Sequence, residues 1–198
     1  MLTSWIKLIT LYLIVGIACV YPLSQSSVHL HIPFVLAILG IVVFMSQFHS
    51  VFFDDFQDDH LAWCLAHQMS LLRLISQKLI DSLFFLIIPL CIAYTLNLLF
   101  WIPAKLLFSH LLAFSLTLLS LSGWSLLLTL AQGKNQSVLI IFILPLAVPS
   151  LLITQSLFSA IALGHEASYY LAMQGGLALF SIAISALLSP LVIRSISW

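Results

Sequence analysis

Long apolar segments follow one another along the chain, separated by short polar stretches. Six such segments can be read from the sequence, at about 5–23, 34–50, 78–99, 106–131, 138–163 and 169–193. Each has about the length that a helix needs to cross the roughly 30 Å hydrocarbon layer of a bilayer. The pattern predicts an all-α integral membrane protein with six transmembrane helices in one transmembrane domain, 1–198. The first segment is long and no small-residue cleavage site follows it, so we interpret it as a retained span rather than a signal peptide.

The polar stretch 52–78 differs from the other connections because it is long and acidic. It reads FFDDFQDDHLAWCLAHQMSLLRLISQK and carries Asp54, Asp55, Asp58 and Asp59. From Asp58 onward, apolar residues recur every three or four positions, which puts them on one helix face; they are Leu61, Leu65, Met69, Leu72, Ile75 and Leu79. Acidic residues at the start, and Arg73 and Lys78 late, suit the helix dipole. We expect an amphipathic helix that lies in the membrane interface or docks on a partner; a solvated loop is the alternative.

Composition supports the membrane class and narrows the function. Hydrophobic residues make up 63% of the chain and charged residues 6%, whereas a soluble domain has about a quarter charged residues. The formal net charge is zero, so electrostatics gives no reason to expect nucleic-acid binding. The three cysteines, Cys19, Cys64 and Cys91, are far apart and form no CxxC pair, which favours small buried residues over redox or metal roles.

The basic residues predict the orientation. With six spans, one side of the membrane receives both termini and five of the six basic residues, and only Lys105 lies opposite; the five are Lys7, Arg73, Lys78, Lys134 and Arg194. Because basic residues accumulate on the cytoplasmic side, both termini and the stretch 52–78 are expected in the cytoplasm.

The fifth and sixth segments have distinctive residues. Pro145 and Pro149 each remove a backbone donor from the fifth, which indicates either a broken helix or a simple kink. The sixth carries Ser181, Ser185 and Ser189, preceded by Ala172 and Gly176 at the same four-residue spacing. Small residues in register predict a close packing face within or between subunits.

No catalytic, cofactor-binding or metal-binding set emerges from the motifs. His29 and His31 lack a third ligand and are interpreted as loop histidines. His165-Glu166 lacks the second histidine of a metalloprotease motif, and Gly133-Lys134 lacks the first glycine and the Ser or Thr of a phosphate loop. Asp81 lies three residues from Lys78, a spacing that favours an ion pair. The chain is therefore expected not to be an enzyme and not to bind ATP itself.

Two stretches together resemble the CcmB family, the membrane subunits of the cytochrome c maturation ABC transporter. Asp54, Asp55, Asp58 and Leu61 match that family's acidic stretch F-x-D-D-x-x-D-G-S/T-L-E, although Asp59 and Ala62 stand where the family has Gly and Glu. The run 144–149, LPLAVP, resembles the family's L-P-L-x-x-P. Length and span order also fit, so the resemblance covers nearly the whole chain.

The resemblance implies an exporter-type ABC permease that forms a homodimer on two CcmA-like ATPase subunits. The stretch 52–78 would hold the coupling helix, with Asp54, Asp55, Asp58, Asp59, Leu61, Leu65, Met69 and Arg73 as ATPase-coupling residues. CcmC-like and CcmD-like membrane subunits and a CcmE-like haem chaperone would complete the assembly. Haem would be cargo rather than a bound cofactor, and ATP would bind the partner.

Two functions from different classes remain open. The chain either couples ATP hydrolysis to haem export or delivery, or serves as a scaffold that anchors an ATPase driving release of a haem–chaperone complex. The expected location is a bacterial inner membrane, with the mitochondrial inner membrane as the alternative.

Overall fold

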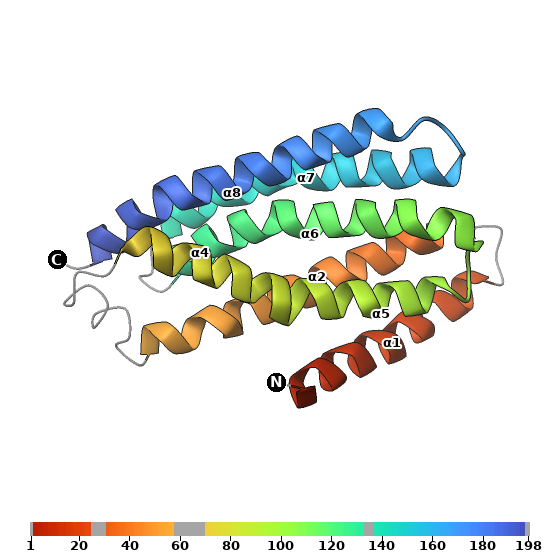
Figure 1. The fold of residues 1–198 in the computed structure, drawn as a ribbon, viewed down its shortest axis with the longest axis horizontal. Helices are drawn as coiled ribbons and strands as arrows, with labels where there is room; N and C mark the ends of the chain where they lie inside the picture. The colour runs from red at the N-terminus through yellow and green to blue at the C-terminus, as the bar shows by residue number, and fades with distance from the viewer. Residues whose placement is uncertain (1, 25–30, 58–69, 133–136, 197–198) are drawn as a thin grey trace.

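The computed structural model describes residues 2–24, 31–57, 70–132 and 137–196, and all regular structure within these ranges is helical. The helices are α1 Leu2–Ser24, α2 Ile32–Gln57, α4 Leu71–Ser82, α5 Ile88–Leu98, α6 Ala104–Gln132, α7 Ser137–Ala162 and α8 Ser168–Ile196. A π-helical turn, Leu83–Ile87, joins α4 to α5, so these three pieces form one rod. The rods lie alongside one another in an elongated bundle (Figure 1).

Connections alternate between the two ends of this bundle. The turns Leu99–Pro103 and Leu163–Ala167 lie at one end, here called the turn end, together with the last residues of α1 (Figure 1). The C-terminal ends of α2, α6 and α8 and the first turn of α4 lie at the opposite end, here called the terminal end. Successive rods therefore run in alternating directions, as short connections require.

The distribution of side chains is that of a membrane protein. Three described helices are long and apolar enough to cross a membrane, at Leu72–Leu98, Ala104–Leu130 and Ser168–Val192; shorter apolar helices lie at Trp5–Tyr21, Ile32–Phe48 and Val148–Ala162. Large apolar side chains such as Leu179 and Leu187 are exposed, whereas Asn97, Gln174 and many Ser and Thr hydroxyls are buried. In soluble proteins, Ser, Thr, Asn and Gln side chains are mostly exposed. Here the outer surface suits lipid, which cannot satisfy polar groups.

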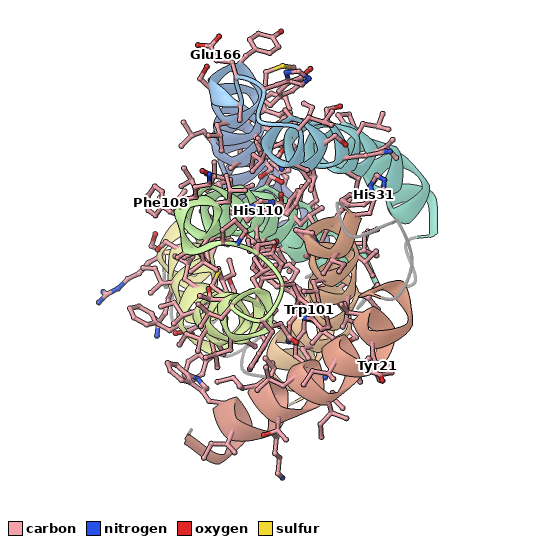
Figure 2. All side chains as sticks on the ribbon, turned by 90° about the vertical axis from the view of Figure 1, so that its right-hand side faces the viewer. Tyr21, His31, Trp101, Phe108, His110 and Glu166 are labelled. Carbon is pink, nitrogen blue, oxygen red and sulfur yellow. The ribbon has the colours of Figure 1, made fainter. Side chains whose placement is uncertain are left out.

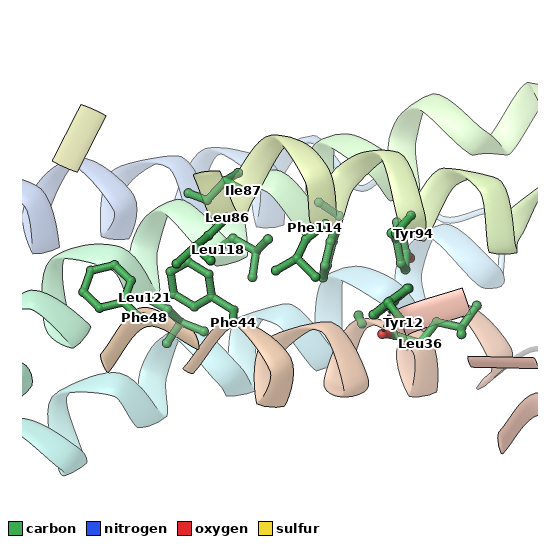
Figure 3. Packing of buried hydrophobic residues seen from close by; sticks show 14 of the residues in the cluster. Tyr12, Leu36, Phe44, Phe48, Leu86, Ile87, Tyr94, Phe114, Leu118 and Leu121 are labelled. Atoms are coloured by element: carbon green, nitrogen blue, oxygen red, sulfur yellow. Dashed lines mark hydrogen bonds between the residues drawn. The ribbon is translucent and has the colours of Figure 1, made fainter. Parts of the chain in front are cut away.

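One half of the interior is an aromatic core. Tyr12, Phe44, Tyr94 and Phe114 are fully buried where α1, α2, α5 and α6 meet (Figure 3). The Tyr94 and Phe114 rings stack at 4.2 Å between centroids. The Tyr12 hydroxyl donates to the Leu36 carbonyl at 2.6 Å and the Tyr94 hydroxyl to the Pro33 carbonyl at 3.2 Å, so both phenols are satisfied while buried.

Glycines let helices approach each other closely within this core. A Cβ on Gly16 would lie 2.9 Å from the Asn97 amide nitrogen, and one on Gly40 would lie 2.5 Å from the Phe114 ring. Because a real Cβ atom essentially never makes a contact this short, a larger residue at either position would force the Asn97 or Phe114 side chain to shift.

The third rod begins earlier than the sequence predicted. The expected span starts at Lys78, but the apolar helix already starts at Leu72 and includes Arg73 and Lys78 in its first turns. Ser70 has an extended backbone with φ −64° and ψ 112°, so one continuous helix over 58–78 is wrong. The second helix also runs on to Gln57 rather than ending at Ser50.

Two further expectations are resolved by the last two helices. α7 is one continuous α-helix from Ser137 to Ala162, so the broken-helix interpretation of Pro145 and Pro149 is wrong. On α8, Ser181, Ser185 and Ser189 are fully buried, but Ala172 and Gly176 are exposed. The two sets therefore lie on different faces and do not form one packing surface.

Candidate functional site

α6 packs closely against α8. A Cβ built on Gly123 would lie 2.5 Å from the Ser181 backbone carbon and oxygen. Ser185 and Ser189 continue the same buried face of α8. The Ser181 and Ser185 hydroxyls each donate a hydrogen bond to the carbonyl three residues earlier on α8, at 3.0 and 2.9 Å respectively. This face is consequently smooth and small, and the polar Gln174 lies almost two turns before it on α8.

A polar cluster joins α6, α7 and α8 inside the bundle. The Thr117 and Thr154 hydroxyl oxygens lie 2.9 Å apart. The Gln174 side-chain nitrogen donates to the Thr117 hydroxyl oxygen at 3.4 Å and to the Ser120 hydroxyl oxygen at 3.2 Å. All four side chains are at most 1% exposed. We call Thr117, Ser120, Ser150, Thr154 and Gln174 the hydroxyl seam.

The hydroxyl seam has hydrogen-bonding capacity that the described chain does not use. The Gln174 Oε1 and Ser150 Oγ atoms are buried without a partner among the described residues. Thr117 and Thr154 also have hydrogen bonds to the carbonyls of Ala113 and Ser150, at 2.8 and 2.6 Å. Every member is an uncharged hydroxyl or amide, so the seam can orient helices or a small polar molecule. It contains no acid, base or strong nucleophile.

Those predicted coupling residues that the structure describes lie at the terminal end. Asp54 and Asp55 lie in the last turn and a half of α2, and Arg73 lies, exposed, at the start of α4. Asp58, Asp59, Leu61, Leu65 and Met69 lie outside the described residues. Asp81 and Lys78 share α4. The sequence thus places acidic and basic groups on the ends of two helices that reach the same end of the bundle (Figure 1).

The described histidines of the turn end belong to no metal-binding group among the described residues. His31 and His165 are exposed, whereas His110 is 1% exposed (Figure 2). The His110 Nδ1–H donates to the Leu106 carbonyl at 2.8 Å, which leaves its Nε2 buried without a partner among described residues. Among these residues no group of three His, Cys, Asp or Glu side chains could hold a metal ion. His29 lies outside the described part.

The hydroxyl seam was missed by the sequence interpretation, although a signal for it exists. Gln174 lies seven residues before Ser181, which is almost two full helical turns, so both residues share one face of α8. Thr117 and Ser120 are three apart on α6 and likewise share a face. A search for polar residues in helical register inside apolar segments would have found all of these.

Comparison with known proteins does not assign the chain to a family: no protein-family model matches it, and no curated protein matches it.

Proposed function

We propose that this chain is the membrane subunit of an ABC transporter complex for cytochrome c maturation. It would span the membrane six times and couple ATP hydrolysis by a CcmA-like partner to haem export, or to haem delivery to a periplasmic chaperone. The resemblance of the acidic stretch and of LPLAVP to the CcmB family motivates this assignment.

The placement of charged residues at the terminal end supports the proposal beyond the motifs. The acidic end of α2 and the basic start of α4 reach the same end of the bundle. Lys7, Arg73, Lys78 and Arg194 belong to the halves of their helices that point toward this terminal end, and Lys105 belongs to the turn end. The positive-inside rule then assigns the terminal end to the cytoplasm, where an ATPase would dock.

A mechanical path from such a docking site exists along the third rod. α4, the π-helical turn and α5 run from Leu71 to Leu98 as consecutive helical pieces. A displacement of α4 by an ATPase would therefore be carried to the turn end by one connected rod, and the π-helical turn is a point where its register can adjust.

The scaffold alternative is favoured by the way the interior is filled. Phe44, Tyr94, Phe114 and Leu118 are fully buried and occupy the aromatic core. A hollow of about 160 Å³ at the turn end has nearly the volume of a cavity known to hold one benzene ring, about 150 Å³, whereas haem has four pyrrole rings. A haem path through a single copy would thus require helices to separate. A scaffold that releases a haem–chaperone complex would not require that movement.

A gene deletion tests both versions at once. Membrane proteins from a strain lacking this gene should show no covalently bound c-type haem by haem staining, and a plasmid copy should restore it. Unchanged c-type haem, in a genome with no second copy, would overturn the proposal. Vesicles containing the purified complex then separate the versions, because ATP-dependent haem accumulation is expected only for transport.

Charge reversal tests the docking end directly. Asp58→Lys combined with Asp59→Lys should lower co-purification of the ATPase by roughly tenfold, the equivalent of about 1.4 kcal/mol. Glu166→Lys, exposed at the turn end, is the matched control and should leave co-purification unchanged. Equal recovery of the ATPase with both variants, at equal membrane content, would contradict the docking site.

A further inference from the structure

A hollow opens at the turn end between the start of α2 and the end of α7. Its volume is about 160 Å³, and its lining includes His31 just before α2, Phe34 from α2, and Phe158, Ser159 and Ala162 from α7. His31 marks its position in the end-on view (Figure 2). An engineered cavity of about 150 Å³ in another protein holds one benzene ring, so this hollow has the volume for a single ring.

The walls of the hollow are aromatic, and one of the wall residues packs against a buried histidine ring. The Phe34 and Phe158 rings are 6.1 Å apart between centroids and tilted by 53°, an arrangement in which a third ring can contact both. Phe158 is buried, and its ring centroid lies 5.7 Å from that of the buried His110 ring. The Nδ1–H of His110 donates to the Leu106 carbonyl, which fixes that ring. The hollow is therefore built on a rigid wall.

Polar groups with free hydrogen-bonding capacity lie at the mouth of the hollow and one turn below it. His31 and Ser159 are exposed and make no hydrogen bond to the described part of the chain. Gln155 lies one turn below Ser159 on the same face of α7, is also exposed, and also has no partner among described residues. An exposed amide on an apolar helix is costly in lipid unless something pairs with it.

The surface leading away from the hollow is apolar. Ile38 lies one turn below Phe34 on α2 and is 45% exposed, and Leu152 lies two turns below Ser159 on α7 and is 60% exposed. A molecule seated in the hollow could therefore extend an apolar tail along these residues into lipid. A small concave site with apolar walls and a few polar groups is the usual form of a ligand site.

We propose that the hollow binds the ring of a lipid-soluble phenol or quinone. The ring would lie against both Phe34 and Phe158, and its oxygen substituents would accept or donate hydrogen bonds to Ser159 and His31 at the hollow or to Gln155 one turn below it. This site is independent of the proposed transporter function, because it uses neither the terminal end nor the hydroxyl seam.

Binding is measured with the full-length protein in lipid nanodiscs and 4-fluorophenol as the probe, observed by ¹⁹F NMR. Saturable binding above that of empty nanodiscs is expected. Ala162→Phe fills the hollow and should weaken binding by about tenfold or more, whereas Ala172→Phe, exposed on α8, should leave it unchanged. Equal binding by wild type and Ala162→Phe, or equal losses in both variants, would overturn the proposal.

A second variant covers a folding defect in the first. Phe34→Leu keeps an apolar wall but removes one aromatic face, and it should weaken binding severalfold while the thermal unfolding of the protein stays near wild type. Binding unchanged by Phe34→Leu would count against the ring site.

The polar rim is tested by comparing two probes. Ser159→Ala should weaken 4-fluorophenol binding by about two- to tenfold, the range of one hydrogen bond, but leave fluorobenzene binding unchanged. Equal effects on both probes would show that the hydroxyl does not contact the ligand oxygen, and would contradict the assigned pose.

Competition identifies the source of the ring. A benzoquinone with a ten-carbon tail should displace 4-fluorophenol, whereas the water-soluble N-acetyltyrosinamide at the same concentration should not. Displacement by the tyrosine derivative alone would overturn the lipid-soluble class and favour a tyrosine of another protein as the occupant.

Discussion

The two halves of this bundle are packed with different chemistry and share one helix. On one side of α6, Phe114 and Leu118 pack into the aromatic core with Tyr12 and Tyr94. On its other side, Thr117 and Ser120 join the hydroxyl seam. The aromatic core is held by large interlocking rings and two phenol hydrogen bonds, whereas the seam is held by small residues and hydroxyl contacts.

This difference shows how association works where water is absent. Burying an apolar ring gains little in lipid, because lipid is equally apolar, so the aromatic core must rely on shape and dispersion. The hydroxyl seam relies on hydrogen bonds that lipid cannot supply. Removal of a ring should therefore leave a void with lost contacts, and removal of a seam residue should cost only its hydrogen bonds.

The largest effect is expected from emptying the aromatic core. Phe114→Ala should lower the free energy of unfolding by about 3 kcal/mol, because Phe114 is fully buried and stacks on Tyr94. Phe108→Ala, 72% exposed on the same helix, should change it by less than about 0.5 kcal/mol. Chemical unfolding of the purified protein in micelles measures both. Similar losses for the two variants would mean that the core does not depend on shape.

The second largest effect is expected where α6 and α8 approach each other closely. Gly123→Ala should lower the free energy of unfolding by about 2 kcal/mol, since its Cβ would meet the Ser181 backbone at 2.5 Å. A Cβ on Gly176 has nothing within 4 Å, so Gly176→Ala should be neutral or slightly stabilising. The same unfolding assay compares them, and a neutral Gly123→Ala would show that α6 and α8 are not in contact at this point.

The hydrogen bonds of the seam should contribute less. In a double-mutant cycle, Gln174→Leu and Thr117→Val should show a coupling of about 0.6 kcal/mol, the average found for such bonds within membranes. The pair Gln174→Leu and Ser122→Ala is the control, because the Ser122 hydroxyl donates to Leu119 instead. Zero coupling for the first pair would contradict the assignment of Gln174 to the hydroxyl seam.

The smallest effect should be the difference in stability between variants of the two phenols. Tyr12→Phe should cost about 1 kcal/mol because its hydrogen bond to Leu36 is short, at 2.6 Å. Tyr94→Phe, whose bond to Pro33 is 3.2 Å long, should cost about half as much. Both changes keep the ring, so unfolding midpoints report the hydroxyl alone. A larger loss for Tyr94→Phe would reverse this ranking.

The sequence predicted the helices well because lipid imposes a long apolar run on each one. Trp101 and Pro103 correctly marked a turn, since Pro103 precedes the first residue of α6. It failed at the start of the third rod, because Leu72, Ile75 and Leu79 fit an amphipathic interface helix as well as the beginning of an apolar one.

The small residues of α8 show a failure of a different kind. Ser185 and Ser189 follow Ser181 at four-residue spacing, but Gly176 precedes it by five. At about 100° per residue, five residues turn the helix by roughly 140° beyond a full turn, so Gly176 faces away. The spacing alone therefore predicts that Gly176 and the three serines lie on different faces of α8. The partners of Gln174, by contrast, come from other helices, and only the packing of α6, α7 and α8 brings them together.

The position of α6 in the chain has a consequence for the order of assembly at the ribosome. Synthesis proceeds from the N-terminus, so α1, α2, α5 and α6 all exist before α7 and α8 are made. The aromatic core can therefore close early, while Thr117, Ser120 and Gly123 still face lipid or the insertion machinery. The nascent protein would therefore carry an uncovered polar stripe on α6 until α8 is synthesised and packs against it.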